Sequence, residues 1–248
     1  MKKKTLIWDL ECTPTIIAAW GIWEQNAVWT EQEWYILSIS YKWLGEKTTK
    51  VIALPDYKGY EKNRLSDRAL LEEWSKVWNQ ADEALAHNGD SFDVKKINAR
   101  MIINGLQPLK PITQIDTKKM AKRFFNFNSN KLQELGRVLN VGSKLQTGGA
   151  DLWRECMAGD MKAWAKMKRY NKQDVVLLEK VYLKLRSFDQ KHPHSQNIDG
   201  CKNCGSTQLQ SRGILTNRNG VRQRYQCSDC GTWNTSKEFI KRFKPEFI

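Results

Sequence analysis

The sequence has no long apolar run. None approaches the roughly 20 consecutive apolar residues that a membrane-spanning helix needs. Met1–Lys4 has the charge of a signal peptide, but the apolar run behind it stops at Asp9, short of an h-region of about 7 residues, and no small-residue cleavage site follows. We therefore expect a cytoplasmic protein with an intact N-terminus, in the host cytoplasm if a phage encodes it, and no membrane partner.

Cysteine is scarce outside one region. Of the six cysteines, four form two C-x-x-C pairs near the C-terminus, and Cys12 and Cys156 stand alone. This spacing is typical of a metal site and argues against the disulfide framework of a small secreted protein. We expect the two isolated thiols to be inert in a reducing cytosol.

Acidic residues are outnumbered. The chain carries 41 Lys and Arg against 27 Asp and Glu, a formal net charge of +14. This charge favours polyanionic partners, nucleic acid above all, through long-range attraction to phosphates. A generally basic surface is the alternative. The excess is spread along the chain, so composition does not locate a binding face.

Strand and helix patterns alternate through the first three quarters of the chain. We expect strands at Thr5–Leu10, Trp34–Trp43, Thr48–Leu54, Glu83–His87 and Ile112–Ile115, the first three as an antiparallel meander. Helices are expected from Asp67 onward and over Phe92–Asn104, Asp116–Phe124, Leu132–Leu139 and Asp160–Phe188. The Trp-rich segment Cys12–Glu33 is expected to be irregular. This order predicts an α/β fold in which crossover helices follow a hairpin meander.

Two acids follow the first apolar run. In LIWDLECTP, Asp9 and Glu11 are two residues apart, so in a strand they project from one face. Two adjacent carboxylates are costly to bury unless a cation lies between them. Carboxylates are also the ligands that Mg²⁺ and Mn²⁺ prefer. The pair therefore indicates either a divalent-metal site or a solvated strand edge.

Further acids lie on two later elements. Asp93 is expected at the start of a helix just beyond a strand, with Phe92 beside it as an apolar anchor. Asn88, at the strand end, could bind substrate or brace the loop, and Asp90 is a competing acid.

Tyr170 and Asp174 are four residues apart on the last long helix and therefore share a face. Such a pair also occurs by chance in many helices. In order along the chain, D-x-E, then N-x₄-D preceded by Phe, then Y-x₃-D resemble the three motifs of the DEDD 3′–5′ exonucleases of the RNase H-like superfamily. Tyr170 is typical of the DEDDy branch. The resemblance covers about Thr5 to Leu185, and Cys12–Gly45 is further similar to phage and prokaryotic predicted exonucleases that end in a four-cysteine element.

The resemblance implies an RNase H-like mixed five-stranded sheet with flanking helices and a two-metal phosphodiester hydrolase. Asp9 would bridge two Mg²⁺ or Mn²⁺ ions, Glu11 and Asp174 would complete the first site, and Asp93 would hold the second. Tyr170 would orient the attacking water. A phenol with a pKa of about 10 is a weak base at pH 7, so the metal ions would do most of the activation. The product would be a 5′-mononucleotide released from a 3′ end.

The C-terminal cysteines have the spacing of a structural zinc site, with 22 residues between the two pairs. The four are Cys201, Cys204, Cys227 and Cys230. Strands at Leu209–Leu215 and Arg222–Gln226, joined by a turn at Asn217–Gly220, resemble a zinc ribbon. A unit this small, with little apolar content, needs a bound metal ion to fold stably. We expect one structural Zn²⁺.

Basic residues dominate this end of the chain, with eleven Lys or Arg and five Asp or Glu from Arg186 onward. We expect the ribbon to bind DNA or RNA, and a protein-docking role is the alternative. The side chains expected to contact nucleic acid are the hairpin arginines Arg218, Arg222 and Arg224. Arg212 lies near them in the sequence, and Tyr225 and Trp233 are available for stacking on bases.

Other side chains are assigned ordinary roles. His87 is expected to pack at a strand end and Asp116 to cap its helix. Lys131, Arg137 and Lys144 either reach phosphates or lie on a solvated helix face. Most tryptophans are expected in the core, with one or two of those between Trp20 and Trp29 available for stacking on bases.

These observations predict an exonuclease domain at residues 1–190, a linker at 191–198 and a ribbon at 199–248. The expected substrate is nucleic acid with a 3′ end, single-stranded DNA in preference to RNA. A non-catalytic nucleic-acid-binding adaptor and a structure-specific endonuclease of the same fold are the alternatives. Proofreading would require a polymerase partner in trans.

Overall fold

The computed structural model describes residues 3–23, 26–189 and 199–243, so the predicted linker at 191–198 lies outside the described residues. Its main part is built on a five-stranded sheet in the order β5-β4-β1-β6-β7. These strands are β1 (Thr5–Cys12), β4 (Ile36–Trp43), β5 (Lys50–Ala53), β6 (Glu83–Ala86) and β7 (Thr113–Asp116). The β1-β4-β5 pairings are antiparallel and the β1-β6-β7 pairings are parallel. The predicted mixed sheet and its meander are confirmed.

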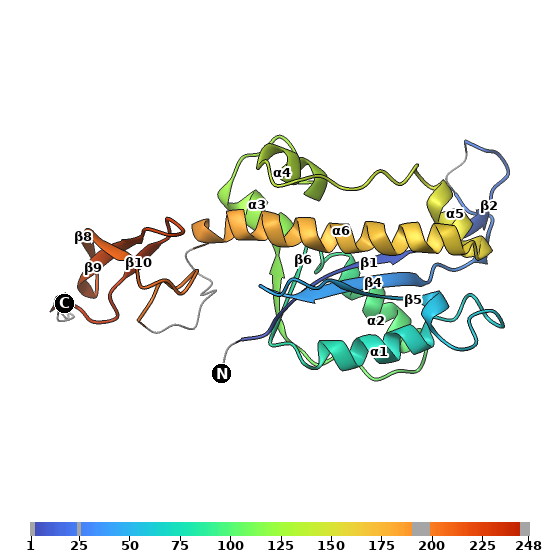
Figure 1. Ribbon diagram of the computed structural model, residues 1–248, viewed down its shortest axis with the longest axis horizontal. Coiled ribbons are helices and arrows are strands. Elements are labelled where there is room, and N and C mark those ends of the chain that lie inside the picture. Colours follow the sequence, from blue (N-terminus) through green and yellow to red (C-terminus); the bar gives the residue numbers. More distant parts are fainter. Residues whose placement is uncertain (1–2, 24–25, 190–198, 244–248) are drawn as a thin grey trace.

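Helices cover both faces of the sheet (Figure 1). The long helix α6 (Met161–Leu185) crosses one face together with α3 (Thr117–Phe124) and α4 (Leu132–Val138). The helices α1 (Arg68–Trp78) and α2 (Asp93–Ile103) lie on the other. Of the helices in the described part of the chain, none is long and apolar enough to span a membrane.

The two faces of β1 have different neighbours, as the period of two in a strand dictates. Trp8 lies on the α1 side, where its ring centroid is 5.1 Å from that of Trp74. Ile7 belongs to the apolar cluster that α6 forms with Val175 and its neighbours. Asp9 and Glu11 continue the Ile7 face, so the strand directs both carboxylates toward α6.

A short hairpin and a short helix in the main part were not predicted. The segment Cys12–Glu33, expected to be irregular, contains the hairpin of β2 (Ile16–Ala18) and β3 (Trp29–Gln32). A helix α5 (Asp151–Ala158) precedes α6 and ends at Gly159, whose φ is 89°. Elements of three to eight residues are too short to establish a period in the sequence. The remaining short elements are the 3₁₀ turns η1 (Leu54–Asp56) and η2 (Arg186–Phe188).

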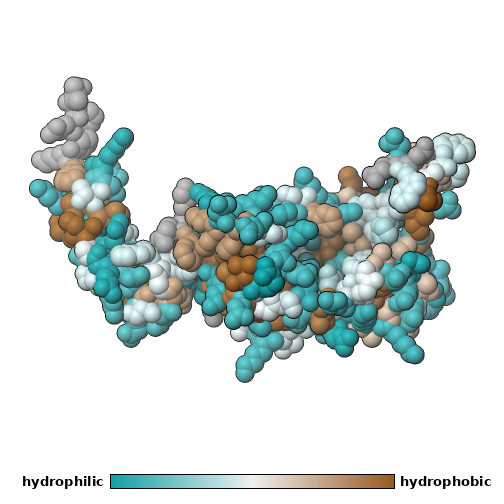
Figure 2. Space-filling view, turned by 90° about the horizontal axis from the view of Figure 1, so that it is seen from above, coloured by the Kyte–Doolittle hydropathy of each residue, from teal (hydrophilic) through white to brown (hydrophobic). Residues whose placement is uncertain are grey.

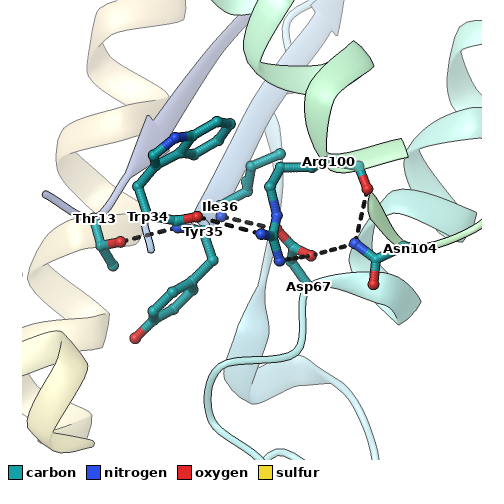
Figure 3. Close-up of polar contacts among 7 residues, drawn as sticks. All are labelled: Thr13, Trp34, Tyr35, Ile36, Asp67, Arg100 and Asn104. Atoms are coloured by element: carbon teal, nitrogen blue, oxygen red, sulfur yellow. Dashed lines mark hydrogen bonds and ion pairs between the residues drawn. The ribbon is translucent and has the colours of Figure 1, made fainter. Parts of the chain in front are cut away.

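A buried polar network holds the base of the β2–β3 hairpin beside the sheet (Figure 3). Asp67 is fully buried and accepts hydrogen bonds from the Ile36 backbone N–H, from Arg100 at 2.7 and 2.9 Å, and from Asn104 at 2.8 Å. Each carboxylate oxygen is thus satisfied, which offsets the cost of burying the charge.

The C-terminal unit has a separate sheet (Figure 1). Its central strand β9 (Gly220–Cys227) pairs with β8 (Leu209–Asn217), β10 (Trp233–Thr235) and β11 (Lys241–Arg242). The predicted hairpin is confirmed and each of its strands is longer than expected. The unit lies beyond the C-terminal end of α6 and forms a distinct lobe (Figure 2).

Candidate active site

Three acids from two elements meet at the end of β1. Carboxylate oxygens of Asp9, Glu11 and Asp174 all lie within 4.8 Å of one another. Asp174 comes from α6, and its side chain is fully buried. Its Oδ1 atom is also buried and has no hydrogen-bond partner among the described residues. A buried carboxylate oxygen without a donor is costly, and a metal ion would supply the missing ligand contact.

A fourth acid, Asp93, lies beside this trio but is not one of the three acids whose oxygens lie within 4.8 Å of one another. It opens α2, is 5% exposed and faces its own backbone N–H and that of Leu10, both of which lower its pKa. Burial raises the pKa of Asp93 to about 7 despite these two donors. Its charge in turn helps to raise the pKa values of Asp9 and Glu11.

Burial and mutual repulsion raise the pKa values of these carboxyls and so favour their protonated forms. Burial is the largest cause for Asp9 and for Glu11, and the nearby Asp174 is the next. The pKa of Glu11 rises to about 8, and that of Asp9 rises well above its ordinary range. A divalent cation would reverse these shifts by stabilising the ionised forms. The four acids therefore fit a Mg²⁺ or Mn²⁺ centre.

A lysine from the loop between α4 and α5 enters the same site. Lys144 Nζ donates to Asp174 Oδ2 at 2.6 Å and to the Tyr170 hydroxyl at 3.2 Å. Burial alone would lower the pKa of Lys144, but Asp174, Asp9 and Tyr170 raise it above its ordinary value. Lys144 is therefore not on a solvated helix face, which corrects one of the two expectations for it.

Asn171 is a site neighbour that sequence reasoning missed. Its side-chain amide donates to Asp9 Oδ2 at 2.7 Å, and its carbonyl oxygen accepts from the Ser38 hydroxyl at 3.1 Å. Ser38 lies opposite Glu11 in the β1–β4 pairing, and Ser40 lies opposite Asp9. Ser38 and Ser40 alternate with apolar residues in β4 and mark a polar face directed at the acids. This alternation is the sequence signal that could have pointed to a polar partner such as Asn171.

Trp153 was also missed, because it lies on the unpredicted helix α5. Its side chain hydrogen-bonds Glu11, which lowers the pKa of that carboxyl against the other causes. Its ring centroid is 5.9 Å from that of Tyr170. Tyr170 itself is 9% exposed, and burial together with Glu11 and Asp174 raises the pKa of its hydroxyl.

Three residues that precede Asp93 in sequence each lie near a lysine. Phe92 is 44% exposed, and the Lys96 Nζ atom lies 5.4 Å from its ring. Asn88 braces the loop, with its carbonyl oxygen accepting from Lys118 at 3.2 Å. Asp90 pairs with a lysine of α3 at 2.5 Å.

The ordinary roles expected for two residues are confirmed. His87 packs at the end of β6 with its ring nitrogens 2.8 Å from the Thr117 hydroxyl and 2.9 Å from the Asn130 carbonyl. Burial lowers the pKa of His87 to about 4. Asp116 caps α3 by accepting from two backbone N–H groups.

Two of the expected basic residues lie outside the site. Arg137 pairs with Glu134 on the surface of α4, and Lys131 is exposed at the start of that helix.

The tryptophans lie in three places, which are the core, the β2–β3 hairpin and, for Trp233, the ribbon. Trp8, Trp74 and Trp164 are fully buried in the core, the place expected for most of the tryptophans. Trp20 and Trp23 are 84% and 89% exposed and lie between β2 and β3. Strand β2 is at the end of the main part away from the ribbon (Figure 1).

The four predicted zinc cysteines converge. Their sulfur atoms lie within 4.8 Å of one another, and both the Cys201–Cys230 and the Cys204–Cys227 sulfur pairs are 3.6 Å apart. A tetrahedral zinc with Zn–S bonds of about 2.3 Å requires S–S distances of about 3.8 Å. The donor set therefore fits one Zn²⁺.

The hairpin arginines are presented on the ribbon. Arg222 donates to the Ser236 carbonyl at 3.1 Å and lies 4.0 Å from the Phe239 ring. Arg224 lies 5.4 Å from the Trp233 ring, and Arg218 is in the exposed turn between β8 and β9.

A sequence profile of the RNase H superfamily matches residues 31–186, well over half of the chain. The chain therefore belongs to the RNase H superfamily. The matched span includes Asp93, Tyr170 and Asp174, and it begins after β1, which carries Asp9 and Glu11.

Among solved structures, the chain is similar to the family B DNA polymerase from the hyperthermophilic archaeon Pyrobaculum calidifontis, with a TM-score of 0.54 and 12% sequence identity. The match covers 75% of this chain and 25% of the polymerase, so the chain spans about a quarter of that protein's length. At this identity the likeness shows a shared fold. A search of curated proteins gave no match.

Proposed function

We propose that this protein is a DEDDy-type 3′–5′ exonuclease that hydrolyses single-stranded nucleic acid, DNA in preference to RNA, to 5′-mononucleotides. The observation that carries the proposal is the meeting of Asp9, Glu11 and Asp174 within 4.8 Å, with Asp93 and Tyr170 beside them. Membership of the RNase H superfamily supports a phosphodiester hydrolase.

The proposal gives each side chain a part. Asp9, Glu11 and Asp174 would hold one Mg²⁺ or Mn²⁺, and Asp9 would share a second with Asp93. When bound, the two ions supply charge stabilisation at the leaving 3′ oxygen and lower the pKa of water. Tyr170 would hold the attacking water in line by a hydrogen bond, because the raised pKa of its hydroxyl makes it a donor rather than a base.

The rest of the chain would serve substrate binding. We propose that residues 1–190 form the exonuclease domain and that residues 199–248, held by one Zn²⁺, help to bind the strand through basic side chains such as Arg218, Arg222 and Arg224. Asn88, just beyond the end of β6, and Phe92, directly before Asp93 in sequence, would contact the 3′ nucleotide. A cytoplasmic setting and a polymerase partner in trans complete the proposal.

The first test is digestion of 5′-labelled single-stranded DNA and RNA of one sequence with Mg²⁺ or Mn²⁺. We expect a ladder that shortens from the 3′ end, faster on DNA. Asp93→Ala and the double substitution Asp9→Ala/Glu11→Ala should abolish it. Asp90→Ala is the matched control, because Asp90 is an acid of the same loop whose partner is Lys119, and it should cleave like the wild type.

Other outcomes would select the alternatives. If the labelled strand keeps its full length in every lane and is still bound in a gel shift, the protein is the non-catalytic adaptor. Cleavage of circular single-stranded DNA would indicate an endonuclease, since an exonuclease requires an end. Equal loss of activity in Asp90→Ala and Asp93→Ala would contradict the assignment of Asp93.

A further inference from the structure

One face of the ribbon carries a hollow of about 350 Å³. Its walls come from three strands and from the first cysteine turn, and the lining residues are Lys202, Leu215, Arg224, Trp233, Asn234 and Thr235. The register explains the grouping. Thr235 pairs opposite Arg224, and Trp233 pairs opposite Gln226, so Arg224, Trp233 and Thr235 project from the same face of the sheet.

The hollow combines an aromatic surface with positive charge. The guanidinium carbon of Arg224 lies 5.4 Å from the Trp233 ring, and Trp233 remains 40% exposed. Lys202 adds a second cation, and Leu215 adds apolar surface. No acid lines the hollow, and within the part of the chain that the structure describes Arg224 forms no ion pair.

A second pairing of cation and ring extends the same face along β9. Arg222, two residues from Arg224 and therefore on the same side of the strand, lies 4.0 Å from the Phe239 ring. Arg242 approaches that ring from β11 at 4.9 Å. Positive groups beside aromatic rings thus recur along the ribbon, as in surfaces that follow a single strand of nucleic acid.

We propose that the hollow is a binding site for one unpaired nucleotide of the substrate strand, with the base against Trp233 and Leu215 and a phosphate at Arg224 and Lys202. The volume is in the range of about 300 Å³ and more that small-ligand sites occupy. Arg224, which forms no ion pair with the described residues and faces a hollow that no acid lines, favours a phosphate there over an ordinary protein surface. This inference rests on the proposed function, because it assigns a substrate contact to the same strand.

The test measures binding separately from hydrolysis. In the full chain carrying Asp9→Ala/Glu11→Ala, the affinity for fluorescein-labelled oligo-dT is measured by fluorescence anisotropy with and without Trp233→Leu or Arg224→Gln. Each change should raise the Kd about tenfold, in line with the usual weight of one stacked base. The two together should raise it by less than the product, because both act on one nucleotide.

Two controls make the result specific. Arg212→Gln removes the same charge from β8, where Arg212 is exposed and contacts Gln210, and should change the Kd by less than threefold. An oligonucleotide of abasic residues should bind the Trp233→Leu and parent proteins equally. Zinc content and circular dichroism of each variant report whether the ribbon is folded, and Arg224→Gln stands as the independent variant if Trp233→Leu is not.

The outcomes separate this inference from the exonuclease proposal. If Trp233→Leu and Arg224→Gln bind within twofold of the parent, or if Arg212→Gln loses as much, the hollow is no nucleotide site and a protein-docking surface replaces it. If the wild type degrades no strand while both variants lose binding, the site stands and the exonuclease proposal falls. In an active chain, the variants should raise KM on long strands and leave kcat unchanged.

Discussion

Lys144 provides the sharpest test of the electrostatics of the site. Its ammonium is 2.6 Å from Asp174 Oδ2, and its charge lowers the pKa values of Asp9, Glu11, Asp93 and Asp174. Asp174 is fully buried, and the Lys144 side chain is 27% exposed. Removing one partner of a buried ion pair costs about 3–5 kcal/mol. Since Asp174 can instead take up a proton, we expect Lys144→Met to cost the lower figure of about 3 kcal/mol.

A cost of this size is readily measured. For a chain of this length each 1 kcal/mol shifts Tm by about 2–4 °C, so Lys144→Met should lower Tm by about 6–12 °C without divalent ions. Mg²⁺ should stabilise both proteins but narrow the gap between them, because the variant lacks the cation that competes for Asp174 and each tenfold gain in Mg²⁺ affinity adds about 1.4 kcal/mol. Titration calorimetry should also show tighter Mg²⁺ binding, since a competing cation has been removed from Asp174.

The assay is differential scanning fluorimetry in a chelator-free buffer stripped of Mg²⁺, which leaves zinc on the thiolates. Lys131→Met is the matched control, because Lys131 is exposed at the start of α4, and it should leave both Tm and the Mg²⁺ response unchanged. The reasoning is wrong if Lys144→Met unfolds at the wild-type temperature without metal, or if its deficit is undiminished at saturating Mg²⁺.

Four further predictions follow from contacts around the site. Asn171→Ala should lower kcat about tenfold with little change in KM, because Asp9 loses the donor that orients it; an unchanged kcat in a steady-state assay would contradict this. Without metal, the raised pKa values of Glu11 (about 8) and Asp93 (about 7) mean that the folded state binds more protons than the unfolded one between about pH 4 and 8. Stability should therefore fall as pH rises from 5 to 8.5, and saturating Mg²⁺ should flatten that slope in urea titrations. Asp67→Asn should cost about 3–5 kcal/mol in the same titrations, because it leaves the buried Arg100 without its counter-charge. Cys204→Ser should lower bound zinc from one per chain toward zero and weaken strand binding while hydrolysis of a trinucleotide continues.

The long helix α6 could be predicted from the sequence because its apolar stripe, which includes Val175 and Leu178, repeats over 25 residues. The five sheet strands, of four to eight residues, could be predicted from their β-forming residues and the turn signals that bound them. The helix α5 and the β2–β3 hairpin have too few residues to show a period. The meeting of Asp9 with Asp174 could be inferred only through family resemblance, since the two are far apart in sequence and no local pattern joins them.

The finer contacts of the site depend on tertiary placement. Lys144 lies in a loop, where neighbouring residues do not determine which way a side chain points. Asn171 is a single polar residue in a helix, and only the serines of β4 opposite the acids hinted at its role. The exposure of Phe92 also depends on tertiary placement, because its position beside Asp93 in sequence does not decide which side of the helix start faces solvent.

The base of the β2–β3 hairpin determines how the chain tolerates insertions and deletions in the hairpin. The Thr13 N–H donates to the Tyr35 carbonyl at 2.9 Å, and the Tyr35 N–H returns a bond to the Thr13 hydroxyl at 3.0 Å. The chain thus leaves the sheet and rejoins it at one closed point, and the Glu11–Ser38 register is set on the sheet side of that point. Residues inserted or removed at the hairpin tip lengthen or shorten a side branch without shifting the acids. The hairpin is therefore a natural place for sequences of one lineage to diverge in length and for an engineered tag to be inserted.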